Sequence, residues 1–113
     1  MFQDIKNIGE FYLWVKGETP VLAYFSTNGC NVCKVLKPKV AQLINESFPK
    51  IKLIYINLSE IPNVGAQLRV FSVPTIIIYF EGKEFIRKSR NVGISELKGE
   101  IGRLYSILFP GNS

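Results

Sequence analysis

The sequence contains no histidine, only two cysteines, one tryptophan and one methionine among its 113 residues. A structural zinc site needs four ligands, mostly cysteine and histidine, so a site within this one chain would need carboxylates or a second chain. No apolar run approaches the roughly eighteen residues that span a bilayer. The segment MFQDIKNIGE also lacks the basic and then apolar layout of a signal peptide. We therefore expect a cytoplasmic protein without a membrane partner.

Blocks of like charge are also absent, although the net charge is +5, with 14 Lys and Arg against 9 Asp and Glu. The basic residues are scattered along the chain, which is typical of solvated faces. A nucleic-acid site would need a basic stripe joined to a recognisable binding motif, and the sequence shows neither. We therefore expect no nucleic-acid partner.

Short apolar runs alternate with helical periodicities, and no repeat or linker divides the chain, so residues 1–113 are predicted to form a single domain. The predicted order is β-α-β-α-β-α-β-β-α. Its crossover units imply parallel strands, and its final hairpin implies an antiparallel pair. The sequence therefore predicts an α/β protein with a mixed central sheet of four or five strands and helices on both faces.

Local signals mark several of these elements. Asn7 with Glu10 three residues later forms a capping box before a short first helix. The run PVLAYFS is typical of a strand buried on both faces. A second helix is predicted over 30–47, with a kink and not an end at Pro38. The last helix is predicted over 95–108.

Both cysteines lie in TNGCNVCKVLKPKV, at the start of that second helix. They could be a reactive dithiol, half of a metal site, or two small core residues. Cys30 follows Asn-Gly at a turn, which disfavours a buried core position. An unperturbed thiol is only about 3% thiolate at pH 7, and a helix N-terminus raises that fraction because it favours an anion. A lone CxxC in the cytoplasm is catalytic or metal-binding more often than structural.

Four features together resemble the thioredoxin family across nearly the whole chain. They are a buried strand leading into CNVCK, Pro38 five residues after the second cysteine, SVPT at 72–75, and NVGISEL before the last helix. The resemblance implies the thioredoxin fold. It also implies a thiol–disulfide oxidoreductase that exchanges a dithiol for a disulfide with protein substrates in two successive steps.

The resemblance assigns roles by position. Cys30 is the exposed nucleophile, Cys33 is the partly buried resolving thiol, and Pro74 is a cis-proline facing them. No cofactor or metal is implied, and the reductant is an enzyme of the thioredoxin-reductase type or a low-molecular-weight thiol. The substrate-binding surface is expected at Gly29, Val73, Pro74 and Gly93.

Departures from the family pattern leave two alternatives open. Thioredoxins have a buried aspartate where Tyr24 stands and an accompanying lysine where Tyr55 stands, so the usual proton-transfer pair is missing. Ser26 and Gly29 replace the flanking tryptophans, and Asn31-Val32 replaces Gly-Pro. The chain could therefore be an interaction module with weak or lost redox activity. It could also be a dimer that shares a zinc ion or an iron–sulfur cluster through two CxxC pairs.

Overall fold

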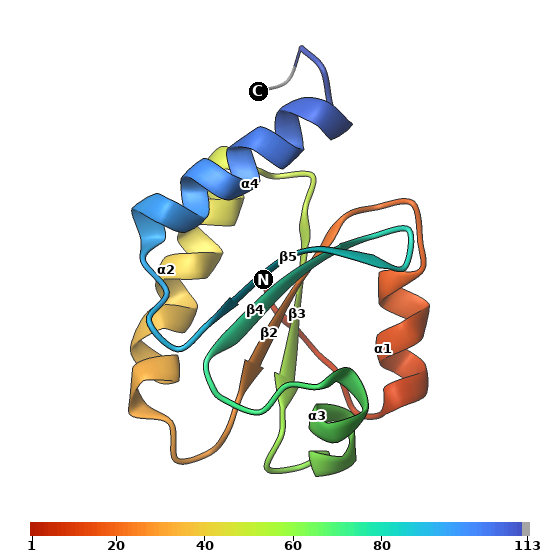
Figure 1. Cartoon of the computed structure of the whole chain (residues 1–113), viewed down its shortest axis with the longest axis vertical. Coiled ribbons are helices and arrows are strands. Elements are labelled where there is room, and N and C mark those ends of the chain that lie inside the picture. Colours follow the sequence, from red (N-terminus) through yellow and green to blue (C-terminus); the bar gives the residue numbers. More distant parts are fainter. Residues whose placement is uncertain (112–113) are drawn as a thin grey trace.

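The computed structural model describes residues 1–111, which form a five-stranded mixed sheet with helices on both faces (Figure 1). The predicted order of elements and the α/β class are confirmed. The strands lie in the order β1-β3-β2-β4-β5 across the sheet. The elements are β1 (Gln3–Asp4), α1 (Ile8–Val15), β2 (Val21–Ser26), α2 (Asn31–Ser47), β3 (Lys52–Asn57), α3 (Pro62–Leu68), β4 (Thr75–Phe80), β5 (Lys83–Ser89) and α4 (Ile94–Leu108).

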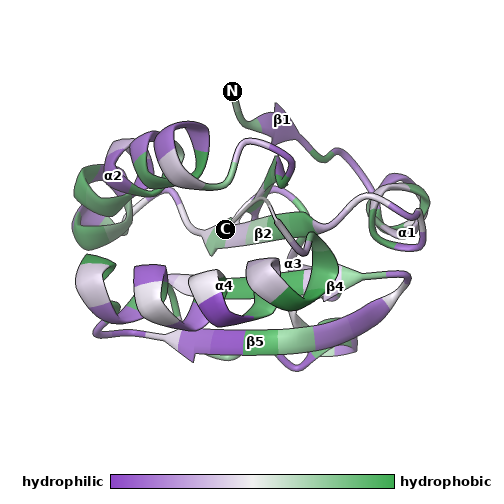
Figure 2. Cartoon of the chain, turned by 90° about the horizontal axis from the view of Figure 1, so that it is seen from above, coloured by the Kyte–Doolittle hydropathy of each residue, from purple (hydrophilic) through white to green (hydrophobic). Residues whose placement is uncertain are grey.

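Strand β2 is the centre of the sheet. It pairs in parallel with β3 and antiparallel with β4, which in turn forms the antiparallel hairpin with β5. All six residues of β2 are buried, as the unbroken apolar run predicted, because the sheet is covered on both faces. Figure 2 shows β2 and β4 as largely hydrophobic, whereas β1 at the edge is hydrophilic.

The two faces of the sheet carry separate cores. Helices α2 and α4 pack on one face, and α1 and α3 pack on the other (Figure 1). Side chains alternate along β2, so Leu22 and Tyr24 belong to the first core, whereas Ala23 and Phe25 belong to the second. Tyr24 therefore faces the helix that carries the cysteines. Within residues 1–111, no helix combines the length and the apolar character needed to cross a bilayer.

The helix ends explain two local details. Asn7 caps α1 by accepting a hydrogen bond from the Glu10 amide at 2.8 Å. The return bond differs from the predicted capping box, because the Glu10 carboxylate accepts from the Lys6 amide at 2.6 Å instead of the Asn7 amide. Helix α2 continues past Pro38 to Ser47, so the prediction that this proline does not end the helix is confirmed.

Candidate active site

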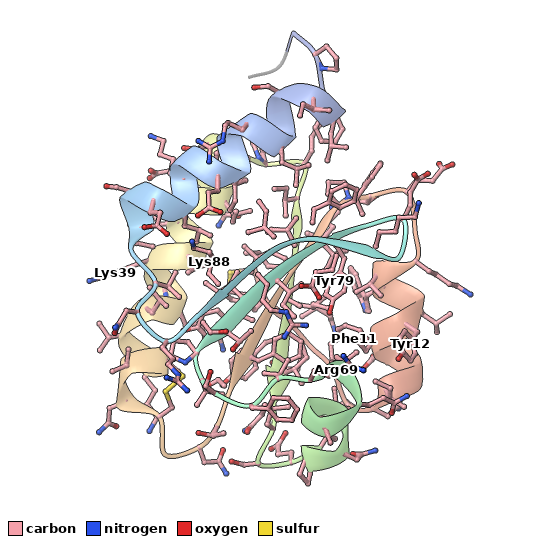
Figure 3. The ribbon with its side chains drawn as sticks, viewed as in Figure 1. Phe11, Tyr12, Lys39, Arg69, Tyr79 and Lys88 are labelled. Atoms are coloured by element: carbon pink, nitrogen blue, oxygen red, sulfur yellow. A yellow bond between two sulfur atoms is a disulfide. The ribbon has the colours of Figure 1, made fainter. Side chains whose placement is uncertain are left out.

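Cys30 and Cys33 form a disulfide at the point where the chain enters α2, with their Cα atoms 5.3 Å apart (Figure 3). Cys30 is the N-cap residue of the helix, and its Sγ accepts a hydrogen bond from the Cys33 amide at 3.1 Å. Its side chain is partly exposed, whereas Cys33 is only 1% exposed. One sulfur therefore faces solvent, and a buried sulfur lies directly behind it.

The first turn of α2 favours negative charge on Cys30 after reduction. The amide that points at the Cys30 sulfur belongs to the unsatisfied N–H groups of a helix start, and the helix dipole is positive at this end. Both effects stabilise a thiolate relative to a thiol. The arrangement provides a nucleophilic sulfur and a second sulfur close enough to attack a mixed disulfide formed on the first.

The loop before β4 contains a cis peptide bond between Val73 and Pro74. Val73 packs, together with Cys30, against the same core that contains Cys33. The Pro74 carbonyl accepts a hydrogen bond from the Arg90 amide at 2.8 Å, which joins this loop to the end of β5. Val73 and both cysteines therefore belong to or pack against the same core.

The two predicted glycines lie in different surroundings. Gly29 stands on the exposed turn before Cys30, and Gly93 is the N-cap of α4. A Cβ atom at either position would meet no atom within 4 Å, so both leave open space beside the backbone. Gly93 lines a groove together with the residues between the cysteines, Asn31-Val32, whereas Gly29, Val73 and Pro74 do not line it.

Tyr24 makes a contact that the sequence did not predict. Its side chain is fully buried, and its hydroxyl donates a hydrogen bond to the Cys33 carbonyl at 2.7 Å. Burial raises the pKa of Tyr24 far above its ordinary value, and the nearby Tyr55 raises it further. The phenol is therefore neutral at physiological pH. Tyr24 acts as a hydrogen-bond donor to the backbone of the redox motif and cannot accept a proton there.

Tyr55 stands where family members carry a lysine, and it stacks on Tyr24 with ring centroids 6.1 Å apart. The Lys37 ammonium lies 3.6 Å from the centre of the Tyr55 ring, a cation–π contact. Two stacked aromatic rings therefore lie next to the Cys33 backbone, because Tyr24 both stacks on Tyr55 and binds the Cys33 carbonyl. Among residues 1–111, no group of three or more Cys, Asp and Glu side chains is placed to hold a metal ion.

Comparison with known proteins identifies the family. The Thioredoxin family model matches residues 5–101. Thioredoxin-like protein YdfQ of Bacillus subtilis (strain 168) is 33% identical over 84 residues, which cover 74% of each chain. Thioredoxin of Rickettsia felis is 28% identical over 82 residues, covering 73% of this chain and 75% of that protein. The crystal structure of thioredoxin from Trypanosoma brucei brucei superposes with a TM-score of 0.82 at 20% identity, covering 92% of this chain and 90% of that one.

The fold and the helix-capping disulfide define a protein of the thioredoxin fold class. The chain belongs to the thioredoxin family. Family membership and the bonded CxxC pair together support thiol–disulfide oxidoreductase activity in the general sense.

The difference in burial between the two sulfurs predicts which thiol reacts first. After reduction and brief exposure to iodoacetamide near pH 7, we expect the label on Cys30, because Cys33 is 1% exposed and away from solvent. Peptide mapping by mass spectrometry measures the ratio of the two labels. Labelling of both cysteines in denaturant is the control for intrinsic reactivity. Predominant label on Cys33 in the folded protein would overturn the roles.

Replacing Tyr24 by Phe removes one buried hydrogen bond and leaves the ring in place. We expect the free energy of unfolding to fall by about 1 kcal/mol, the usual net value of such a bond. Urea unfolding monitored by circular dichroism gives this value. Tyr55→Phe is the matched control, because the Tyr55 hydroxyl has no hydrogen-bond partner within residues 1–111. Equal stability of Tyr24→Phe and the wild type would show that the bond contributes nothing.

Proposed function

We propose that this protein exchanges the Cys30–Cys33 dithiol/disulfide with disulfides of protein substrates in the cytoplasm. The observation that carries the proposal is the pairing of an exposed sulfur at a helix N-terminus with a buried sulfur one turn inside. The two relatives described above, a thioredoxin and a thioredoxin-like protein, support the same class of chemistry. A thioredoxin-reductase-type enzyme or a low-molecular-weight thiol returns the disulfide to the dithiol.

The reaction transfers two electrons from the dithiol to the substrate. The Cys30 thiolate attacks one sulfur of the substrate disulfide, a Cys30–substrate disulfide forms, and the other substrate sulfur leaves as a thiolate that takes a proton from water. Cys33 then loses its proton, and its thiolate attacks the Cys30 sulfur. This second exchange forms the Cys30–Cys33 disulfide seen here and releases the second substrate thiolate.

Substrate binding is proposed on the surface around the exposed sulfur. The backbone of Val73 pairs with an extended segment of the substrate, a form of strand addition, while Pro74 fixes the loop that presents it. Gly29 and Gly93 leave space for that segment because neither has a side chain. The interaction-module alternative uses the same surface without electron transfer.

One titration separates this proposal from both alternatives. The protein is equilibrated with defined ratios of reduced to oxidised glutathione, the thiols are trapped by acid, and metal content is measured on the same sample. We expect a single two-electron transition and no bound metal. The absence of any transition would favour the interaction module. Stoichiometric zinc or iron that is lost together with one CxxC cysteine would establish the metal-linked dimer instead.

The buried, neutral Tyr24 side chain leads us to expect slow release of the substrate from the mixed disulfide with Cys30. A buried Cys33 thiol must lose a proton before it can attack, and Tyr24 cannot take that proton because burial raises its pKa and keeps the phenol neutral. Tyr24→Asp supplies a carboxylate at this position. We expect it to resolve a preformed mixed disulfide on Cys30 faster than the wild type below about pH 8, on the order of tenfold.

The matched control is Tyr24→Asn, which has the shape of Asp without its basic oxygen. Resolution is followed by quenched-flow mass spectrometry across the pH range, and circular dichroism checks that each variant is folded. Folded Tyr24→Asp and Tyr24→Asn proteins that both resolve at the wild-type rate would show that proton removal from Cys33 is not limiting.

A further inference from the structure

A groove of about 740 Å³ begins at the residues between the two cysteines and runs between α2 and the segment that leads into α4. Its α2 wall includes Val32, Val35 and Lys39, and its opposite wall includes Arg90 and Gly93. The groove is open because Gly93 has no side chain and nothing lies within 4 Å of its Cβ position. Val73 and Pro74, proposed above for strand addition, do not line it.

Aliphatic side chains follow Asn31 along the α2 wall of the groove. Val32 and Val35 are 63% and 60% exposed, although both are aliphatic. They are three residues apart on α2, so their side chains are neighbours on one side of the helix. Leu36 also lines the groove, and it is buried, so the apolar surface continues into the core. The site can therefore hold an aliphatic side chain close to the reacting sulfur.

The groove also contains two basic side chains, Lys39 and Arg90. Lys39 lies one turn beyond Val35, and in Figure 3 it extends outward from α2. Arg90 directly follows β5, and its amide donates to the Pro74 carbonyl, which fixes its backbone relative to the active-site loop. Within residues 1–111, neither Lys39 nor Arg90 forms a salt bridge, so both cations are available to a ligand.

The acidic residue in this groove is already paired. Glu96 also lines it, and its carboxylate lies 2.5 Å from the Lys88 ammonium. Lys88 binds Glu100 at 2.7 Å as well, and the hydrogen bond to Lys88 lowers the pKa of Glu96. The charge of Glu96 is thereby compensated in part within the protein. The charges left without a partner in the groove are positive.

We propose that this groove binds an acidic segment of the protein substrate beside its reactive disulfide. An aliphatic side chain of that segment packs on Val32 and Val35, and its carboxylates pair with Lys39 and Arg90. Lys39 lies seven positions after Val32, a rise of about 10 Å along a helix, which equals about three residues of extended chain. The carboxylate that pairs with Lys39 therefore lies about three residues from the substrate cysteine. This inference rests on the proposed function and adds the substrate class.

The test uses three cyclic peptide disulfides that differ at two positions, three and four residues beyond one cysteine, occupied by Glu, Gln or Lys. A leucine precedes these positions in each peptide. Reduction by the dithiol form of the full chain is followed in single turnover. Each rate is divided by the rate with dithiothreitol, which removes the effect of the flanking charges on the disulfide itself.

We expect the normalised rate for the Glu peptide to exceed that for the Lys peptide by about tenfold at low salt, since two exposed ion pairs form with one and are replaced by repulsion with the other. Added salt should reduce the ratio because exposed charges are screened. The Lys39→Glu/Arg90→Glu double variant should reverse the preference. Both side chains are exposed, so this variant retains the fold.

The matched control is Lys52→Glu/Lys83→Glu, which changes the net charge equally. Lys52 pairs with Val21 and Lys83 with Phe80, so both lie at the end of the sheet opposite the disulfide. This variant should keep the preference for the Glu peptide. If it lost the preference as fully as the groove variant, net charge and not the groove would be responsible, and the proposal would be wrong.

Three other outcomes of the peptide experiment would contradict one of the two proposals. Equal normalised rates for all three peptides would overturn the groove assignment while leaving the oxidoreductase intact. Failure to reduce any peptide would instead contradict the proposed function. A groove variant that slowed glutathione disulfide as much as the Glu peptide would show that the groove accepts any small anionic disulfide, and the assignment to a protein segment would fail.

Discussion

The hydrogen bond from the buried Tyr24 hydroxyl to the Cys33 carbonyl ties the central strand of the sheet to the first turn of α2. This bond holds the backbone of Cys33 close to β2. Cys33 consequently lies inside the core, and Cys30 remains at the N-terminal end of the helix with a partly exposed sulfur. The unequal exposure of the two cysteines, three residues apart, is the basis on which we predict different roles for the two thiols.

The same bond changes the proton chemistry of the site. A buried carboxylate can take a proton from a neighbouring thiol, whereas a neutral phenol that already donates its hydrogen cannot. Tyr55 and Lys37 fill the adjoining space with an aromatic stack and a cation–π contact. Where a buried carboxylate would have to be desolvated, this protein has the neutral Tyr24 side chain next to the CxxC motif. No charge is therefore removed from water at this position.

Much of the fold could be predicted from local patterns, because apolar periodicity reports which face of each element is buried. The unbroken run in β2 predicted a strand buried on both faces, and the spacing of apolar residues predicted α2 through Pro38. The sequence could not show the bond from Tyr24 to Cys33, because it depends on how far a helix sits above a strand. Alternation along β2 was the one available signal that Tyr24 faces α2. The groove could not be predicted for a similar reason. Lys39 and Arg90 line it together only because two segments distant in the sequence pack beside each other.

The most direct test of the account is to trap the intermediate of the exchange. Cys33→Ser and Cys30→Ser variants are each reduced and mixed with insulin, whose chains are joined by disulfides, and the products are separated without reductant. We expect Cys33→Ser to accumulate a mixed disulfide through Cys30 and Cys30→Ser to accumulate none, because Cys33 is buried. A mixed disulfide formed only by Cys30→Ser, or by neither variant while wild-type protein reduces insulin, would contradict it.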